Sequence, residues 1–315
     1  MKNNHKFYFD RFKDVDKITF MGFKEFVFKF LKSLKVKVLI QGNFSRPQAI
    51  DVVENVLKNL NGEIANNVIP KVKKTVLNEI PLGTSYLRVK SMLPNDKNSI
   101  VKNYYQIGFA TVETECLLEL LVKVMREPLF NYIRTKEQLA YSVACVMKKD
   151  CDILGLEIIV ETQEKRNPSK VIDLKIEIFL IDFAATLREL EEEDFETIKR
   201  SIIAQKLSTD TELECEVNRN WSEIRESKYQ FERNDIEARQ LELIRKDDLV
   251  VFYDHHLSTE NVRKLSMQIV ANADNGYDSL LQHGFLHLDL ITDDKQNTIK
   301  NIAQFKKSLA ACLRC

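Results

Sequence analysis

Glycine and proline are scarce in this sequence, with 8 Gly and 6 Pro among 315 residues. So few turn and linker residues exclude a low-complexity or loop-dominated chain and favour a compact protein rich in helix. No apolar run reaches the roughly 18 residues that a membrane span needs. The start, MKNNHKFYFDRFKD, lacks the uninterrupted apolar core of a signal peptide.

Net charge is also absent, because 47 Lys and Arg balance 47 Asp and Glu. No bulk electrostatic field draws the chain toward nucleic acid or an anionic membrane, so we expect neither as a partner. The 6 cysteines are scattered over a chain too large to need disulfide staples. Reduced thiols in a cytoplasmic protein are the simplest interpretation.

Catalytic motifs are missing as well. The sequence contains no G-x-S-x-G, Walker loop, G-x-G-x-x-G, H-E-x-x-H or H-x-x-E-H. His283 and His287 have the spacing of one helical turn, but Gly, Phe and Leu between them offer no carboxylate to activate water. With Cys312 and Cys315 of the terminal CLRC they would make a four-ligand zinc set, or the two pairs are unrelated.

The remaining histidines have an ordinary structural interpretation. His255 and His256 end an expected amphipathic helix, where positive charge complements the helix macrodipole. From the residues alone we therefore assign no catalytic residue and no metal ligand.

Hydrophobic periodicity predicts helices and strands in mixed order. The expected helices are 23–34, 45–60, 113–138, 168–190, 191–207, 216–244 and 245–257. The expected strands are 35–43, 84–93, 100–110, 140–150, 154–163 and 262–274, with 84–93 and 100–110 forming a hairpin across the turn at 94–99. Strands followed by helices and a returning strand predict an α+β fold, a layered mixed sheet with packed helices.

Local signals refine these helices. Ser45 and Ser169 are expected helix caps, and Pro128 is expected to bend or break the helix that contains it. The acidic run at 191–194 lies where a helix N-terminus favours negative charge, so we interpret it as capping rather than binding.

A helix, a short loop, an alternating strand and a polar turn occur twice, at 23–43 and at 245–274, roughly 225 residues apart. This order predicts one partial and one complete repeat of the same unit, separated near the Pro-containing, basic stretch 67–83. The alternative is that helix–strand pairs are common in any α/β protein and that these two are unrelated.

One stretch has a specific resemblance. EPLFNYIRTKEQLAYSV, residues 127–143, resembles the E-P-x-F-x-x-L-R-T-K-E-Q-L-G-Y segment of the nardilysin and insulin-degrading-enzyme group in the pitrilysin (insulinase) family of zinc peptidases. QGNFSRPQAI, CDILGLEIIVETQ and EVNRNWSEIRESKYQFERNDIEA resemble further segments of that group, and the last of these is closer to its nardilysin members.

The resemblance implies an architecture of four repeated α+β domains, folded as two halves that close over a chamber. Residues 1–77 would be the end of the third domain, and 78–315 the fourth. The family's zinc site, an inverted H-x-x-E-H, lies in the first domain, which has no counterpart here. The resemblance therefore implies a non-catalytic C-terminal half, with zinc in the missing N-terminal half.

The resemblance also implies substrate contacts. Its Arg and Tyr, which contact the bound peptide, match Arg134 and Tyr141. On the residues alone, Arg134 is equally a surface cation at a helix end, and Tyr141 a half-buried strand aromatic. The family usually has Gly before this Tyr, where this sequence has Ala140. Either Ala140 shifts Tyr141, because alanine cannot adopt angles that only glycine tolerates, or it is accommodated.

Three interpretations follow. The first is the chamber-closing half of a metalloendopeptidase that binds peptide substrate beside an N-terminal catalytic half, on the same polypeptide or in trans. The second is a free-standing inactive protein that binds peptides or a partner. The third is a metal-binding protein using the four His and Cys ligands. If 1–77 is a domain end, the apolar helix 23–34 lacks its sheet, and we expect an exposed apolar patch that supports self-association, for example as a homodimer.

Overall fold

The computed structural model describes residues 11, 14–32, 34, 36–60, 77–93, 95–257, 261–271, 290–291 and 298–309. The chain divides into two compact units. One contains the described residues from 77 to 206 and from 235 to 309, and the other contains those from 11 to 60 and from 207 to 234. The two compact units are defined by contacts within the chain, whereas the predicted domains are defined by repeated sequence units. The domain boundaries 1–77 and 78–315 therefore stay a prediction.

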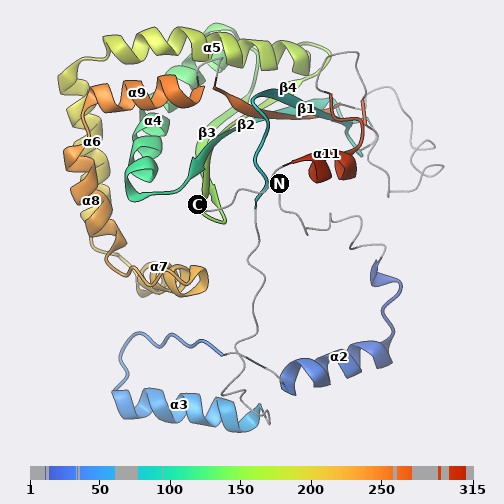
Figure 1. Ribbon diagram of the computed structural model, residues 1–315, viewed down its shortest axis with the longest axis vertical. Coiled ribbons are helices and arrows are strands. Elements are labelled where there is room, and N and C mark those ends of the chain that lie inside the picture. Colours follow the sequence, from blue (N-terminus) through green and yellow to red (C-terminus); the bar gives the residue numbers. More distant parts are fainter. Residues whose placement is uncertain are drawn as a thin grey trace. The chain divides into compact units, whose positions relative to one another are not determined.

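The first unit is built on a five-stranded sheet in the order β1-β5-β2-β4-β3 (Figure 1). The strands are β1 (Gly83–Lys90), β2 (Asn98–Phe109), β3 (Ser142–Asp150), β4 (Ile153–Gln163) and β5 (Arg263–Val270). β1 and β5 run parallel, and the other neighbours run antiparallel. The sheet is therefore mixed, as the sequence predicts.

The expected hairpin of 84–93 and 100–110 is wrong. β5 lies between β1 and β2, with Ser266 opposite Tyr86 on one side and Leu265 opposite Tyr104 on the other. β5 has buried residues on both faces, which is typical of a central strand, and it pairs with β1 on one edge and with β2 on the other. A turn-rich link at 94–99 was therefore insufficient to make the two strands partners.

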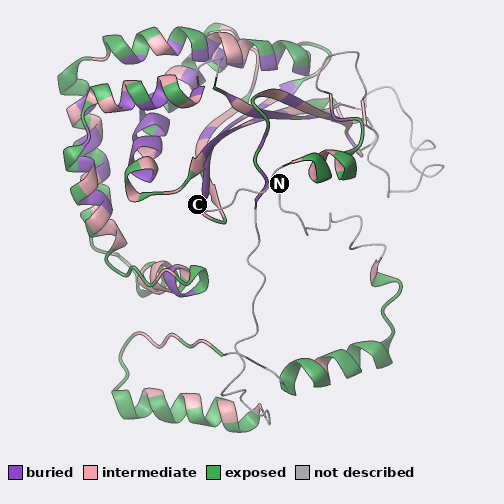
Figure 2. Ribbon diagram, viewed as in Figure 1, coloured by how far each residue is buried: buried purple, intermediate pink, exposed green. Residues whose placement is uncertain are grey.

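Helices cover one face of this sheet. They are α4 (Val112–Phe130), the π-helix η1 (Asn131–Lys136), α5 (Ser169–Glu189), α6 (Glu192–Leu207), α8 (Arg233–Leu243) and α9 (Lys246–Leu257), whereas α11 (Ile302–Ser308) lies on the opposite face. α4, α5 and α9 pack on the strands through a continuous apolar core that includes Leu118, Ile158, Phe183 and Phe252 (Figure 2). This arrangement confirms the predicted α+β class.

A smaller core lies on the opposite face. Tyr104 and Tyr105 are consecutive strand residues, so they point to opposite faces of the sheet. Tyr105 belongs to the main core, whereas Tyr104 packs with Leu265, Ile299 and Phe305. The segment around α11 therefore covers part of the second face.

Helix ends match the sequence signals unevenly. Ser45 caps α3 (Arg46–Asn59) in a capping box with Gln48, as predicted. Ser169 is instead the first residue of α5, and its backbone N–H donates to Glu164 at 2.9 Å. α4 continues past Pro128 and changes to the wider π-helix after Phe130.

The expected helix 216–244 is two helices. α7 (Leu213–Glu226) ends at Ser227, whose left-handed backbone (φ 58°) stops it before α8 begins. A serine in the left-handed conformation does not mark a helix end in the sequence as glycine or proline would. Hydrophobic periodicity therefore predicted one helix where there are two.

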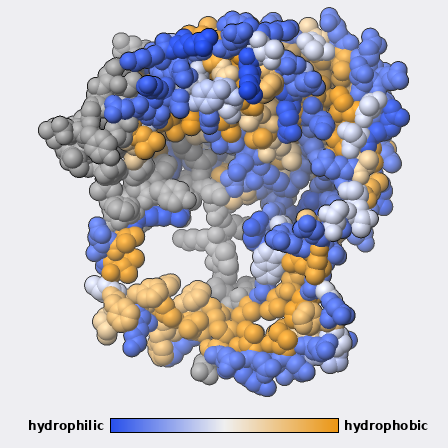
Figure 3. Space-filling model, turned by 180° about the vertical axis from the view of Figure 1, so that it is seen from behind, coloured by the Kyte–Doolittle hydropathy of each residue, from blue (hydrophilic) through white to orange (hydrophobic). Residues whose placement is uncertain are grey.

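The second unit contains α2 (Phe20–Lys32), α3 and α7. α2 and α3 have no buried residue, and Phe20, Phe26 and Phe28 on α2 are each more than half exposed (Figure 2). Figure 3 shows apolar side chains gathered over α2 and α3. The predicted exposed apolar patch is therefore present, and self-association through it stays a prediction.

The segment expected as strand 35–43 is not a strand in its described residues, 36–43. Alternating Lys and Val give it the right pattern, but a strand needs a neighbour for its backbone hydrogen bonds, and no described segment pairs with it. Polar contacts hold it to α7 instead: Lys37 Nζ donates to the Ile224 carbonyl at 2.9 Å, and Asn220 Nδ2 donates to Gln41 Oε1 at 3.0 Å.

Candidate functional site

Arg134 is presented by the π-helix that follows α4. Its neighbour Ile133 is fully buried and fixes η1 to the core, while Arg134 itself is exposed. The guanidinium carbon lies 5.1 Å from the centre of the Phe130 ring, a cation–π contact. No carboxylate or hydrogen-bond partner engages this guanidinium within the described residues. Its donors are therefore available to a ligand.

The loop between η1 and β3 is held by its backbone. The Leu139 carbonyl accepts from Thr162 Oγ1 at 2.7 Å and from Asn167 Nδ2 at 3.0 Å. The Leu139 N–H donates to the Ile133 carbonyl at 3.0 Å. These three hydrogen bonds fix the chain between Arg134 and Tyr141, so neither residue sits on a loosely held loop.

Tyr141 begins the approach to β3. Its N–H donates to the Glu161 carbonyl at 3.3 Å, and its side chain is 43% exposed. Partial burial, and the negative charges of Glu161 and Asp96, raise the pKa of the Tyr141 hydroxyl. The hydroxyl therefore stays protonated at neutral pH and can donate a hydrogen bond.

Ala140 is accommodated at its position. The residues with positive φ in this loop include Gln138 (φ 52°) and not Ala140. Ala140 also packs its methyl group against the main core. The left-handed conformation that a glycine would ease falls two residues earlier, so Ala140 adds no backbone strain before Tyr141.

Arg134 and Tyr141 lie near the same end of β3. α4 runs antiparallel to β3, because Glu115 pairs with Lys149 at 2.5 Å and Arg126 Nη2 reaches the Cys145 carbonyl at 3.5 Å. From Arg126 to Arg134 a helix rises ~12 Å. From Cys145 back to Tyr141 a strand spans ~13 Å. The two predicted substrate contacts are therefore brought to a common level, although no hydrogen bond joins them in the described chain.

A second cluster of ionisable groups is buried between the sheet and α5. Lys264 has no exposed surface, and its Nζ lies 2.6 Å from Asp173 Oδ1 and 2.7 Å from Glu177 Oε1. Tyr105 donates to the same Glu177 oxygen at 2.6 Å. Burial first, and then Glu177, raise the pKa of Tyr105 well above its usual value. Because these groups satisfy one another away from solvent, we interpret the cluster as structural.

Two patterns in the sequence point to this cluster. Lys264 and Ser266 occupy alternate positions of β5 on the face where apolar residues are usual. Asp173 and Glu177 are one turn apart on α5, which places both carboxylates on one helix face. A buried ion pair between a strand and a helix could have been predicted from these two patterns together.

The predicted role of His256 is wrong. Burial, and then repulsion from His255, lower the pKa of His256 to about 4. His256 is therefore uncharged at neutral pH and cannot complement the macrodipole of α9, although both histidines do lie in its last turn. Its ring packs against Phe252 at 4.7 Å between ring centres.

The described residues offer neither a metal site nor a membrane-spanning helix. No group of three His, Cys, Asp or Glu side chains there could hold a metal ion. His283, His287, Cys312 and Cys315 lie outside the described residues. None of the described helices combines the length and the apolar character needed to cross a bilayer.

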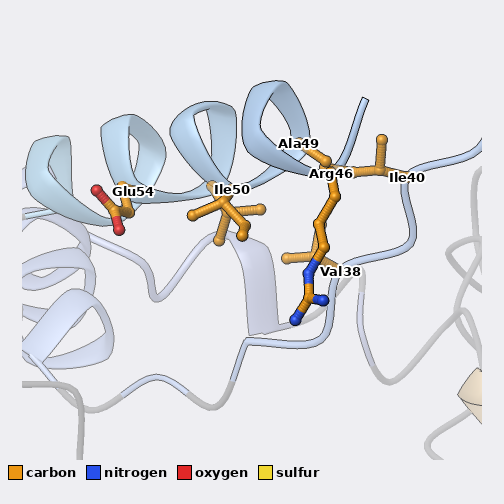
Figure 4. Close-up of a pocket in the computed structure, with 7 residues that line it drawn as sticks. Val38, Ile40, Arg46, Ala49, Ile50 and Glu54 are labelled. Atoms are coloured by element: carbon orange, nitrogen blue, oxygen red, sulfur yellow. The ribbon is translucent and has the colours of Figure 1, made fainter. Parts of the chain in front are cut away.

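The second unit contains an open apolar hollow of about 330 Å³. Val38 and Ile40 of the segment 36–43 form one side, and Ala49, Ile50 and Val53 of α3 form the other. Figure 4 shows Arg46 and Glu54 at either side of Ile50 on this helix. Apolar walls with few converging polar groups fit packing against another protein segment better than recognition of a small polar ligand.

Comparison with known proteins identifies relatives of this chain. A family model described as the PQQ synthase PqqF-like C-terminal lobe domain 4 matches residues 120–221, a span that contains both Arg134 and Tyr141. Human nardilysin is 34% identical over 81% of this chain and 22% of its own length. The chain belongs to the pitrilysin family.

Other similarities agree with this membership. The mouse insulin-degrading enzyme is 26% identical over 82% of this chain and 25% of its own length. The crystal structure of pitrilysin has the same fold, with a TM-score of 0.74 at 16% identity over 98% of this chain and 31% of that one. The chain thus spans about a quarter or less of these two sequence relatives and corresponds to the C-terminal part of the pitrilysin family.

Proposed function

We propose that this chain is the non-catalytic C-terminal half of a nardilysin-like zinc metalloendopeptidase, and that Arg134 and Tyr141 contact its peptide substrate. The arrangement at the end of β3 carries the proposal. A guanidinium without a carboxylate or hydrogen-bond partner among the described residues and a protonated phenol are exposed there, at the two ends of a backbone segment fixed through Leu139.

The chemistry of these two groups suits a peptide. A guanidinium offers several fixed donors to backbone carbonyls, and a tyrosine hydroxyl donates to a carbonyl whose oxygen gains negative charge. Zinc bound in the N-terminal half would supply the activated water. The residues of this chain do not fit that zinc, since the sequence has no H-x-x-E-H. We therefore assign peptide binding and chamber closure to this chain, and hydrolysis to a half on the same polypeptide or in trans.

The exposed apolar face of α2 favours a second candidate function. A catalytically inactive protein that grips peptides or a partner chain would also need a face of this kind, and a homodimer is one arrangement that would cover it. The thiols of Cys116, Cys145 and Cys215, which form no disulfide within the described residues, fit the cytoplasmic location that we propose in either case.

Binding of a labelled peptide tests the proposal. The insulin-degrading enzyme is named for acting on insulin, so fluorescein-labelled insulin B chain is a suitable extended probe. We expect Arg134→Ala and Tyr141→Phe each to weaken its binding about tenfold, as loss of one good hydrogen bond predicts. Fluorescence anisotropy measures the affinity.

Matched controls come from exposed residues of the same types elsewhere. Arg200 lies on α6, and Tyr229 lies in the second unit at 51% exposure. Arg200→Ala and Tyr229→Phe should leave the affinity unchanged. Absence of binding by the unmodified chain, or equal losses in the site and control variants, would argue against the assigned contacts.

A further inference from the structure

The two edge strands of the sheet, β1 and β3, differ in the backbone hydrogen bonds on their outer sides. On the outer side of β1 the chain adds its own backbone, since the Ile291 N–H donates to the Arg88 carbonyl at 3.0 Å and the Ile299 N–H donates to the Tyr86 carbonyl at 2.8 Å. On the outer side of β3, no strand from the described part of the chain is paired. Among the described strands β3 is therefore the open edge, and it begins next to Tyr141.

The hairpin turn shows which groups of β3 point outward. Cys151 and Asp152 both have positive φ, 47° and 64°, as a two-residue type I′ turn requires. Such a turn closes on a hydrogen-bonded pair, here Asp150 and Ile153. Bonded and non-bonded pairs alternate along an antiparallel ladder. Val143, Cys145 and Met147 therefore direct their backbone N–H and carbonyl groups away from β4.

An independent contact agrees that the Cys145 carbonyl points away from β4. The Cys145 carbonyl accepts from Arg126 Nη2 at 3.5 Å, a donor from α4 rather than from β4. Val143 has no such partner in the described residues, so its outward N–H and carbonyl are open.

Protection of this edge is uneven. Proteins often guard an open strand with lysines, and Lys148 and Lys149 lie at the turn end of β3. The other end, Ser142–Val146, carries no charged residue. The unguarded end is the one at the level of Arg134 and Tyr141.

We propose that an extended peptide binds along 142–146 as a sixth strand of the sheet. It would accept from the Val143 and Cys145 amides and donate to the Val143 carbonyl, the mode of recognition known as β-augmentation. Arg126 and Arg134 lack a carboxylate partner in the described chain, so a peptide with a carboxylate beside them is favoured. This inference rests on the proposed function, because the same peptide would carry the groups that Arg134 and Tyr141 contact.

The test removes one outward donor. Val143→Pro deletes the Val143 N–H, and an edge strand tolerates proline where its N–H faces solvent. We expect affinity for fluorescein-labelled insulin B chain to fall about tenfold, whereas Val143→Ala, which keeps the amide, should bind like the unmodified chain. Amide hydrogen exchange of the unmodified chain gives a second measurement: the probe should slow exchange within 142–147.

The outcomes separate the two proposals. If Arg134→Ala weakens binding while Val143→Pro does not, and exchange within 142–147 is unchanged by the probe, strand addition is wrong and the proposed function stands. If the unmodified chain does not bind the probe, both fail. If Val143→Pro does not fold, the exchange measurement on the unmodified chain decides alone.

Discussion

Lys264→Met should destabilise the first unit strongly. The substitution keeps the length of the side chain and removes a charge that lies 2.6 Å from Asp173 and 2.7 Å from Glu177. The Glu177 side chain is 37% exposed and can regain water, but that of Asp173 is only 6% exposed. After the substitution Asp173 keeps hydrogen bonds from Asn103, Ser266 and Tyr86. The cost therefore comes mainly from one stranded buried carboxylate.

Breaking a buried ion pair from one side costs about 3–5 kcal/mol. Since the remaining hydrogen bonds partly satisfy Asp173, we expect about 3 kcal/mol, a large share of the ~5–15 kcal/mol that stabilises a typical domain. Urea unfolding followed by far-UV circular dichroism measures the loss. The single tryptophan, Trp221, is unsuitable as a probe because it lies in the other unit.

Two comparisons isolate the cause. Arg188→Met breaks a surface pair with Asp254, whose side chains are 49% and 45% exposed, and should cost below about 1 kcal/mol. Adding Asp173→Asn to Lys264→Met removes the stranded charge, so the double variant should cost less than the sum of the single ones. Strictly additive costs, or a Lys264→Met variant as stable as the unmodified chain, would refute the reasoning.

The same pair predicts a dependence on alkaline pH. Burial alone lowers the pKa of Lys264, but attraction to Asp173 and Glu177 and hydrogen bonds to both outweigh it, so the pKa is raised above 10.5. A raised pKa contributes stability that is complete below the unfolded value and is lost as pH rises through the folded one. Lys264→Met should lack this alkaline loss.

Two further substitutions test the electrostatics and the site. The unmodified chain should lose stability as pH falls from about 6.5 toward about 4, because the folded state resists protonation of His256. His256→Gln should remove this loss, and urea midpoints measured across that pH window check it. Thr162→Val removes one of two side-chain donors to the Leu139 carbonyl. We therefore expect peptide affinity to fall a fewfold although Tyr141 is still present. An unchanged affinity would show that this hydrogen bond does not position Tyr141.

Several features followed from the sequence by itself. Ser45 and Gln48 make a capping box because both partners lie within one turn of the chain. The strands β3 and β4 and the helices α4, α5 and α9 follow from apolar periodicity, since that pattern records which face each element buries. The motif around Arg134 and Tyr141 could also be recognised from the sequence, because its residue types and spacing lie within one short segment.

Only the tertiary structure decided which elements meet. Periodicity marks a buried face but not the neighbour that covers it, so the position of β5 between β1 and β2 was not predicted. The same limit concealed the Lys264–Asp173 pair, whose partners are far apart in sequence. It also concealed the edge position of β3 beside Tyr141, because an edge depends on which strands of the described sheet lie next to each other, and no local pattern records that.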